Sequence, residues 1–259
     1  MTNILNHKVL GQGSSLIIMH GLFGSLDNWI TLAKQFAQTR QVILVDLRNH
    51  GKSFHSSQMN FDLMSADVVK LMSHLGISTA SILGHSMGGK VAMQMAAKHQ
   101  NSVETLIVAD ISPRKYQSRH NEIINALQSL NPAELTSRNE ADEQLMQKIE
   151  SFGVRQFLLK NLSRTKDGSF EWRMNLKGIV ANYENIIDAV ALEPTFEWPT
   201  LFLKGENSNY ILESDETEIW NSYPNAEIEE ISHAGHWLHA DNPAAFYKIT
   251  EKFLTQNVL

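Results

Sequence analysis

Short apolar runs alternate with helix-length segments along most of this chain, and no other feature restricts its fold as strongly. The runs are rich in Ile, Val and Leu, as strands buried on both faces are. Such strands, separated by helices, predict an α/β architecture with a mostly parallel sheet and helices on both faces. The expected strands are 15–19, 42–45, 81–83, 106–109, 200–203 and 226–231. The expected helices lie at about 27–38, 62–75, 88–98, 213–222 and 243–256.

The region from about 112 to 194 breaks this alternation. It consists mostly of amphipathic helical segments, with a short stretch at 172–174 and no clear buried strand. Because it separates two strand signals and has no Gly/Ser-rich linker, we expect a mainly helical cap inserted after the strand that ends near Asp110. The core then comprises residues 1–111 and 195–259, and the cap 112–194. A second independent domain is the alternative.

The composition limits the possible partners. The 259 residues are enough for one large α/β domain. The net charge of −6 is dispersed and there is no basic run, which argues against nucleic acid and anionic membrane surfaces as partners. The absence of cysteine excludes disulfides, thiolate metal sites and a cysteine nucleophile. No apolar signal-peptide core and no membrane-spanning run are evident, so we expect a cytoplasmic protein without stable membrane insertion.

The pattern G-x-S-x-G at 84–88 stands between an apolar run and a helical segment. A serine on a sharp strand-to-helix turn exposes its hydroxyl at the sheet edge, where the N-terminus of the helix faces it. The flanking glycines let the chain turn without side-chain clashes. We therefore take Ser86 as the candidate nucleophile. The pentapeptide alone is a weak signal, so this interpretation depends on partners elsewhere in the chain.

A serine hydroxyl needs a base to remove its proton, and the base needs an acid that fixes its tautomer. In known proteins that carry a nucleophilic serine on a strand-to-helix turn of this kind, the partners follow in the order serine, acid, histidine, so the base is expected after the last strand. His236 lies there, in a loop of small residues, and is the candidate base. His233 and His239 flank it, and we interpret both as loop or pocket residues of ordinary surface polarity.

In many proteins with this arrangement of strands and helices, the acid follows the penultimate strand, a few residues after a glycine. Ser208 occupies that position here, and a hydroxyl cannot stabilise an imidazolium as a carboxylate does. Asp110 ends the strand 106–109, and its side chain would leave the same edge of the sheet as Ser86. We favour Asp110 over Glu206 as the acid. The structural alternative for Asp110 is a capping or loop carboxylate that contacts the backbone.

Negative charge that develops on a substrate oxygen is best stabilised by preorganised backbone N–H groups. One donor is expected at Met87, directly after the candidate nucleophile. The second is expected in the loop after the first predicted strand, at Leu22 with Phe23 as the alternative, and Gly21 allows close backbone approach there. Four polar residues are interpreted as structural groups that hold these loops in place through hydrogen bonds: His20, Asp46, Arg48 and His50.

Four side chains are candidates for substrate binding. Phe23, Tyr210 and Trp237 would supply the apolar surface that small-molecule pockets usually have. Arg119 lies soon after Asp110, at the start of the expected cap, and a guanidinium suits a carboxylate or a phosphate. Two interpretations of Arg119 are equally open: an anchor for an acidic substrate tail, or a surface cation or structural partner of a nearby carboxylate.

Four patterns share the order and spacing of the α/β-hydrolase superfamily, which this chain resembles: His20-Gly21, D-x-R-x-H-G-x-S at 46–53, G-H-S-M-G-G at 84–89 and Gly235-His236. In finer detail these patterns, with the segments 205–208 and 234–240, resemble the bacterial YbfF-type esterases. The resemblance implies a carboxylesterase, with acyl-CoA thioesterase activity as a further option. It also implies an acid after the earlier strand, consistent with Asp110.

The expected substrate is a small-molecule ester or thioester, and acyl transfer through a serine needs no metal or organic cofactor. A serine at the nucleophile position argues against dehalogenase or epoxide hydrolase chemistry, which uses a carboxylate on this fold. Two alternatives stay open. One is a ligand receptor of the same fold with slow or no turnover, and the other is a C–C bond hydrolase or lactonase.

Overall fold

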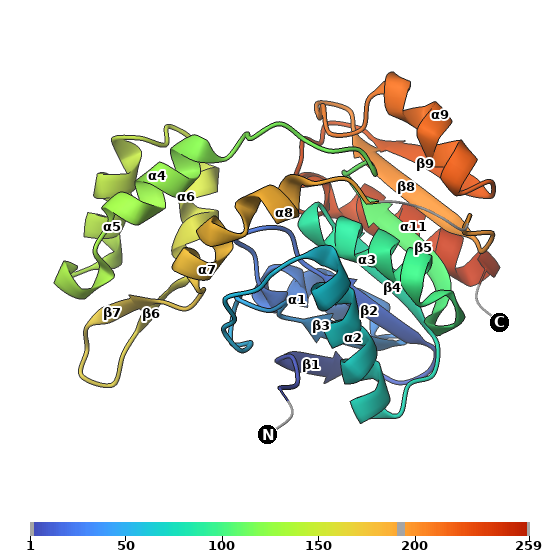
Figure 1. The fold of residues 1–259 in the computed structure, drawn as a ribbon, viewed down its shortest axis with the longest axis horizontal. Helices are drawn as coiled ribbons and strands as arrows, with labels where there is room; N and C mark the ends of the chain where they lie inside the picture. The colour runs from blue at the N-terminus through green and yellow to red at the C-terminus, as the bar shows by residue number, and fades with distance from the viewer. Residues whose placement is uncertain (1–2, 191–194, 258–259) are drawn as a thin grey trace.

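The computed structural model describes residues 3–190 and 195–257, and its centre is a seven-stranded sheet with the order β1-β3-β2-β4-β5-β8-β9 (Figure 1). β1 pairs antiparallel with β3, and every other neighbouring pair is parallel. The predicted α/β class with a mostly parallel sheet is confirmed. The strands are β1 (His7–Leu10), β2 (Ser15–Met19), β3 (Gln41–Val45), β4 (Ala80–His85), β5 (Val103–Ala109), β8 (Thr200–Gly205) and β9 (Ala226–Ile231).

Six of these strands coincide with the predicted strands. β2, β3 and β4 are buried along most or all of their length, because neighbouring strands and helices cover both faces. The sequence gives no signal for β1. That strand has only four residues, lies at the edge of the sheet and is partly exposed, so it shows neither an apolar run nor a clear alternation.

Helices cover both faces of the sheet (Figure 1). On one face α2 and α3 pack with Ile17 and Met19 of β2, and on the other α1 and α11 pack with Leu16 and Ile18. Successive side chains of a strand point to opposite faces, so a strand covered twice must be apolar throughout. No helix in residues 3–190 and 195–257 has the length and apolar character that a membrane crossing requires. The helices of the core are η1 (Leu26–Trp29), α1 (Ile30–Phe36), α2 (Phe61–Leu75), α3 (Met87–Lys98), η2 (Gln100–Ser102), α9 (Glu213–Ser222), α10 (Leu238–Asp241) and α11 (Pro243–Asn257).

The chain between β5 and β8 forms a group of short helices and one hairpin beside the sheet (left in Figure 1). The antiparallel β6–β7 hairpin has no signal in the sequence, because each strand is only three residues long. Asn161 Nδ2 fixes the group to the core by donating to the carbonyl oxygen of Phe23 at 2.7 Å. The expected end of the cap at 194 lies outside the described residues. The elements are α4 (Asn121–Ser129), η3 (Pro132–Glu134), α5 (Arg138–Met146), α6 (Phe152–Leu159), β6 (Leu162–Arg164), β7 (Phe170–Trp172), α7 (Leu176–Ala181) and α8 (Tyr183–Ile187).

Candidate active site

Ser86 lies on the turn between β4 and α3, with φ 52° and ψ −119°. This conformation is rare for a residue with a side chain, and a hydrogen bond of 2.9 Å from its N–H to the carbonyl oxygen of Ala109 holds it. The turn leaves no room for a side chain at Gly84 or at Gly88. A Cβ at Gly84 would lie 2.1 Å from the carbonyl oxygen of Gly88, and a Cβ at Gly88 would lie 2.6 Å from that of Met19. The two glycines of the G-x-S-x-G pattern are therefore a steric requirement of the turn.

Three side chains from three segments form one hydrogen-bonded chain at the carboxyl end of the sheet. His236 Nε2 lies 3.0 Å from Ser86 Oγ, and His236 Nδ1 lies 2.7 Å from Asp110 Oδ2. Ser86 follows β4 and Asp110 follows the neighbouring β5, while His236 comes from the loop after β9. The ring of His85 holds this loop by donating from Nε2 to the carbonyl oxygen of His236 at 2.7 Å. The structure thus brings together the predicted nucleophile, base and acid.

Asp110 is fully buried, and donors surround its carboxylate. Oδ1 accepts the N–H of Gly205 at 3.0 Å, and Oδ2 accepts the hydroxyl of Ser208 in addition to the ring of His236. Ser208, which occupies the position after the penultimate strand where such an acid often lies, therefore donates to a carboxylate that the adjacent strand supplies. Because the donors come from separate segments, the orientation of the carboxylate is fixed.

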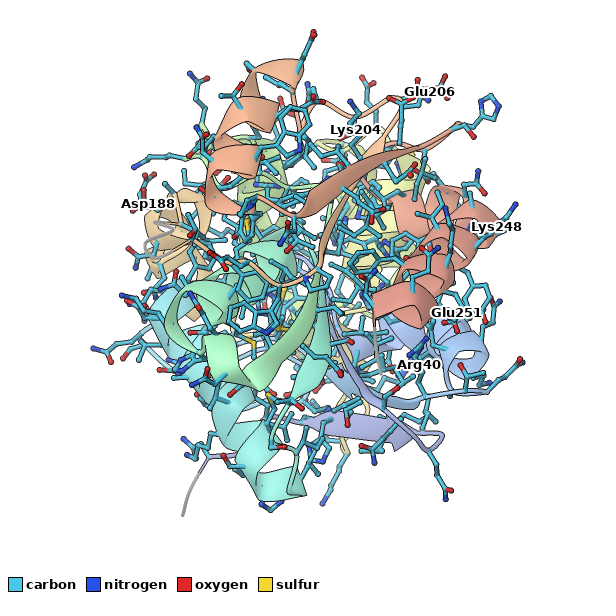
Figure 2. The ribbon with its side chains drawn as sticks, turned by 90° about the vertical axis from the view of Figure 1, so that its right-hand side faces the viewer. Arg40, Asp188, Lys204, Glu206, Lys248 and Glu251 are labelled. Carbon is cyan, nitrogen blue, oxygen red and sulfur yellow. The ribbon has the colours of Figure 1, made fainter. Side chains whose placement is uncertain are left out.

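Glu206, the alternative acid, lies at the surface just beyond β8 (Figure 2). Its Oε2 accepts the N–H of His233 at 2.6 Å, and the side chain of His233 is exposed, as predicted. For His239 the prediction of surface polarity is wrong. His239 lies on α10, about one helical turn after His236, and its buried ring stacks on Trp29 with the centroids 4.1 Å apart. Burial lowers the pKa of His239 to about 3.

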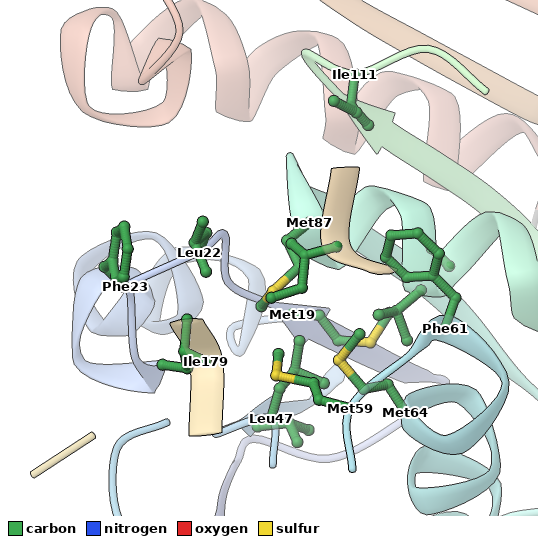
Figure 3. Packing of buried hydrophobic residues seen from close by; sticks show 14 of the residues in the cluster. Met19, Leu22, Phe23, Leu47, Met59, Phe61, Met64, Met87, Ile111 and Ile179 are labelled. Carbon is green, nitrogen blue, oxygen red and sulfur yellow. The ribbon is translucent and has the colours of Figure 1, made fainter. Parts of the chain in front are cut away.

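Leu22 and Met87, the predicted donors of an oxyanion hole, belong to one buried cluster (Figure 3), and both line a pocket that contains Ser86. Met87 is the first residue of α3, so its N–H has no partner within the helix. The N–H of Phe23 is already engaged, because it donates to His50 Nε2 at 3.2 Å. This geometry favours Leu22 over Phe23 as the second donor.

His50 and His20 hold the loop that carries Leu22. Each ring contacts a backbone carbonyl oxygen through Nδ1, at 3.0 Å and 2.8 Å, and accepts a backbone N–H at Nε2. His50 accepts from Phe23, and His20 accepts from Leu47 at 3.1 Å. Burial lowers the pKa of His50 to about 3 and that of His20 to about 4, so both rings are neutral, as one donor and one acceptor require. These bonds provide the bracing that the sequence predicts for both histidines.

Two pockets meet at Ser86, and Leu22 and His120 also border both. The Tyr116 pocket is further lined by Met87, Lys90, Ile111, Tyr116, Gln117, Arg119, Ile186, Ile187 and Tyr210. The Trp237 pocket is further lined mainly by His20, Phe23, Trp29, Val154, Phe157, His236, Trp237 and His239. The four predicted substrate-binding residues are therefore divided: Arg119 and Tyr210 face one pocket, and Phe23 and Trp237 face the other.

Tyr210 stacks on the candidate base. Its ring centroid lies 3.7 Å from that of His236, with an interplanar angle of 14°. Burial raises the pKa of Tyr210 to about 12, so the phenol stays neutral beside the imidazole. The exposed Arg119 lies next to it, with the guanidinium carbon 5.5 Å from the Tyr210 ring centre and Nη1 donating to Asn209 Oδ1 at 2.8 Å.

The sequence assigns no role to His120, although it borders both pockets. Its Nδ1 lies 2.8 Å from the hydroxyl of Tyr183, and burial lowers its pKa to about 4, so it is neutral near His236. Its position depends on a contact with a residue 63 positions later in the chain. No local pattern in the sequence signals such a contact.

Residues 15–243 match the family described as the alpha/beta hydrolase fold. The chain therefore belongs to this family, as the sequence patterns indicate, and it is a hydrolase.

The names of individual relatives indicate which kind of hydrolase the chain is similar to. A protein of Danio rerio named sn-1-specific diacylglycerol lipase ABHD11 is 40% identical over 253 residues, which cover 94% of this chain and 79% of that protein. Esterase YbfF of Escherichia coli (strain K12) is 35% identical over 244 residues, 94% of each chain. A solved structure of a marine microorganism esterase is 40% identical, with a TM-score of 0.95 over 98% of this chain and 100% of that one. The predicted resemblance to esterases of the YbfF type is confirmed.

Proposed function

We propose that this protein is a serine carboxylesterase that hydrolyses small-molecule esters through an acyl-enzyme intermediate. The observation that carries the proposal is the chain of hydrogen bonds from Ser86 through His236 to the buried Asp110. Its distances are those that a nucleophile, a base and an orienting acid need. The relatives named as esterases and lipases support the same reaction class.

Hydrolysis would proceed in two acyl transfers. Ser86 Oγ attacks the ester carbonyl carbon while His236 Nε2 takes its proton, and the N–H groups of Leu22 and Met87 stabilise the oxyanion. His236 then gives the proton to the leaving oxygen, the ester C–O bond breaks, and the acyl group stays on Ser86. A water molecule that loses its proton to His236 attacks the acyl-enzyme, and the acid is released as Ser86 regains its proton.

The two pockets indicate where the halves of the ester would lie. A general acid must reach the leaving oxygen, and His236 lines the Trp237 pocket. We therefore assign the alcohol or thiol half to the Trp237 pocket and the acyl half to the Tyr116 pocket. Ile111, Ile186 and Ile187 give the Tyr116 pocket an apolar wall, which suits an aliphatic acyl chain.

The substrate class includes acylglycerols, because one relative is named as a diacylglycerol lipase, and acyl-CoA thioesters are the second candidate. Arg119 at the Tyr116 pocket would hold a substrate tail that carries a carboxylate or a phosphate. The variant Arg119→Ala should then lower kcat/KM for an anionic substrate more than for a neutral ester of equal length. Equal losses on both would contradict the anchor.

The deciding experiment measures hydrolysis of nitrophenyl esters from acetyl to palmitoyl by the wild type and by Ser86→Ala. Turnover that the variant lacks would support the proposal, and the preferred chain length would measure the acyl pocket. A diacylglycerol and an acyl-CoA compared in the same assay distinguish ester from thioester preference. Hydrolysis that persists in Ser86→Ala would refute the role of Ser86. Saturable ester binding without turnover would favour a ligand receptor.

A further inference from the structure

Two segments connect the group of helices between β5 and β8 to the core, and residues 188–190 of the second lie beside the first. The outgoing segment follows Asp110, and the returning segment follows α8. The N–H of Tyr116 donates to the carbonyl oxygen of Ile187 at 2.8 Å, and the N–H of Val190 donates to that of Pro113 at 2.9 Å. The two connections are therefore linked to each other just above the sheet.

Lys90 of α3 joins both connections to the core. Its side chain is buried, and Nζ donates to the carbonyl oxygens of Pro113 at 3.3 Å, Arg114 at 2.5 Å and Asp188 at 2.5 Å. Two of these acceptors belong to the outgoing segment and one to the returning segment. An ammonium group has three N–H donors, so three carbonyl oxygens use all of them.

This lysine lies directly behind the candidate nucleophile. It stands one helical turn after Ser86, and its N–H donates to the carbonyl oxygen of Ser86 at 3.1 Å. Lys90 also lines the Tyr116 pocket, and its Nζ lies 5.0 Å from the ring centre of Tyr116. One side chain therefore contacts the helix of the nucleophile, both connections and the wall of a pocket.

Stability alone does not explain a lysine at this position. Burial lowers the pKa of Lys90 to about 7, with Arg114 acting in the same direction and the carboxylates of Asp188 and of Glu218 on α9 opposing it. An apolar side chain of equal length would fill the space without that desolvation penalty. What an apolar side chain cannot do is hold three carbonyl oxygens from two segments in one place.

We propose that Lys90 is a positioning residue that locks both connections to the helix behind Ser86 and thereby fixes the shape of the Tyr116 pocket. The assignment of acyl chains to that pocket rests on the proposed function, whereas the lock itself does not. Tyr116 comes from the outgoing connection, and Ile187 ends the helix that precedes the returning one. Without the ammonium group, the carbonyl oxygens of Arg114 and Asp188 lose this donor, and the two connections lose the hydrogen bonds that join both of them to α3.

Hydrogen exchange tests the lock without any turnover. Lys90→Met keeps the length of the side chain and removes its donors. Gln94→Met on the same helix is the matched control, because buried Gln94 bonds Asp62 of α2 and lies outside both pockets. In the Ser86→Ala background, Lys90→Met should speed exchange of the Tyr116 and Val190 amides about tenfold, the factor for one lost buried hydrogen bond, while Gln94→Met should not. Unchanged protection in Lys90→Met would overturn the proposal.

The proposal can still be tested if Lys90→Met does not fold. If Lys90→Met fails to fold, Lys90→Gln is measured in its place, since its amide keeps two of the three donors and should give a smaller increase in exchange. An increase that is equal at amides far from the connections, such as those of β2, would mean general destabilisation and would also overturn the proposal.

Kinetics test the consequence for the pocket. With Ser86 intact, Lys90→Met should raise KM for an octanoyl ester about tenfold more than it raises KM for an acetyl ester. Equal changes for both esters would show that the lysine does not shape the acyl pocket. Failure of the proposed function would appear differently, as hydrolysis that survives Ser86→Ala, and would leave the exchange result standing.

Discussion

Replacing Asp110 by asparagine removes one charge and almost no volume, and the structure fixes which way the new amide must turn. The main-chain N–H of Gly205 points at Oδ1 from 3.0 Å and cannot rotate away. The amide oxygen of Asp110→Asn must face this donor, so its NH₂ group takes the place of Oδ2. Oδ2 is the atom that now accepts from His236 Nδ1 at 2.7 Å and from the hydroxyl of Ser208. The hydroxyl of Ser208 can turn and accept, but the imidazole must change its tautomer.

The changed tautomer determines the size of the effect. Facing an NH₂ group, His236 carries its proton on Nε2, the atom 3.0 Å from Ser86 Oγ, and can no longer remove the serine proton. For the same substitution in the best-studied serine protease the loss in kcat is ~10⁴, which we expect here as well. That factor corresponds to about 5.4 kcal/mol of transition-state stabilisation.

The assay compares steady-state hydrolysis of a nitrophenyl ester by the wild type, Asp110→Asn and Glu206→Gln, with thermal unfolding as the control for folding. We expect Asp110→Asn to unfold near the wild-type temperature and to lose nearly all turnover, and Glu206→Gln to keep it. Near-normal turnover in Asp110→Asn, combined with collapse in Glu206→Gln, would refute the assignment of the acid.

Two further predictions concern the histidines. The variant His50→Phe removes the acceptor for the N–H of Phe23 and loosens the loop that carries Leu22, the proposed oxyanion donor, so kcat should fall about tenfold with KM nearly constant; a change confined to KM would contradict this. Four buried histidines have pKa values lowered from 6.5 to about 3 or 4, so the unfolded chain binds more protons than the folded one below pH 6.5. The free energy of unfolding should therefore drop as the pH falls from 6.5 towards 4, by up to about 1.4 kcal/mol per pH unit for each histidine. Urea unfolding on both sides of pH 6.5 measures this, and constant stability would refute it. These histidines are His20, His50, His120 and His239.

How far the fold can be predicted depends on how much of each element is buried. β2, β3, β4, β5 and β8 appear in the sequence as apolar runs, because burial on both faces leaves no other choice of residues. β9 lies at an edge of the sheet, contains three glutamates and is buried only at Ile231, so the prediction of a buried strand is wrong there. β1 and the β6–β7 hairpin are short and partly exposed, so tertiary pairing and not composition makes them strands. The insertion could be recognised only as a break in the pattern, since its amphipathic helices carry no information about which core loops they touch.

The candidate site also combines residues that the sequence predicts with contacts that it does not predict. Ser86, Asp110 and His236 can be placed from sequence because each follows a predicted strand, and parallel strands end at one edge of the sheet. The burial of His239 against Trp29 and the bond between His50 and Phe23 cannot be read from any local pattern. Both depend on side chains that meet only after the sheet has formed.

The prediction of Asp110 as the candidate acid depends on the order of the strands in the sheet. β5 lies between β4 and β8 in the sheet, so the turn after β5 is flanked by the turn with Ser86 on one side and by the turn with Ser208 on the other. A carboxylate that leaves either β5 or β8 can therefore reach the same point next to His236. This chain places the carboxylate on β5, at Asp110, and keeps a small hydroxyl on β8 that donates to it. The fold fixes the location of the candidate acid at the sheet edge, whereas either of two neighbouring strands could supply it, which is why a motif defined by spacing along the chain would have missed Asp110.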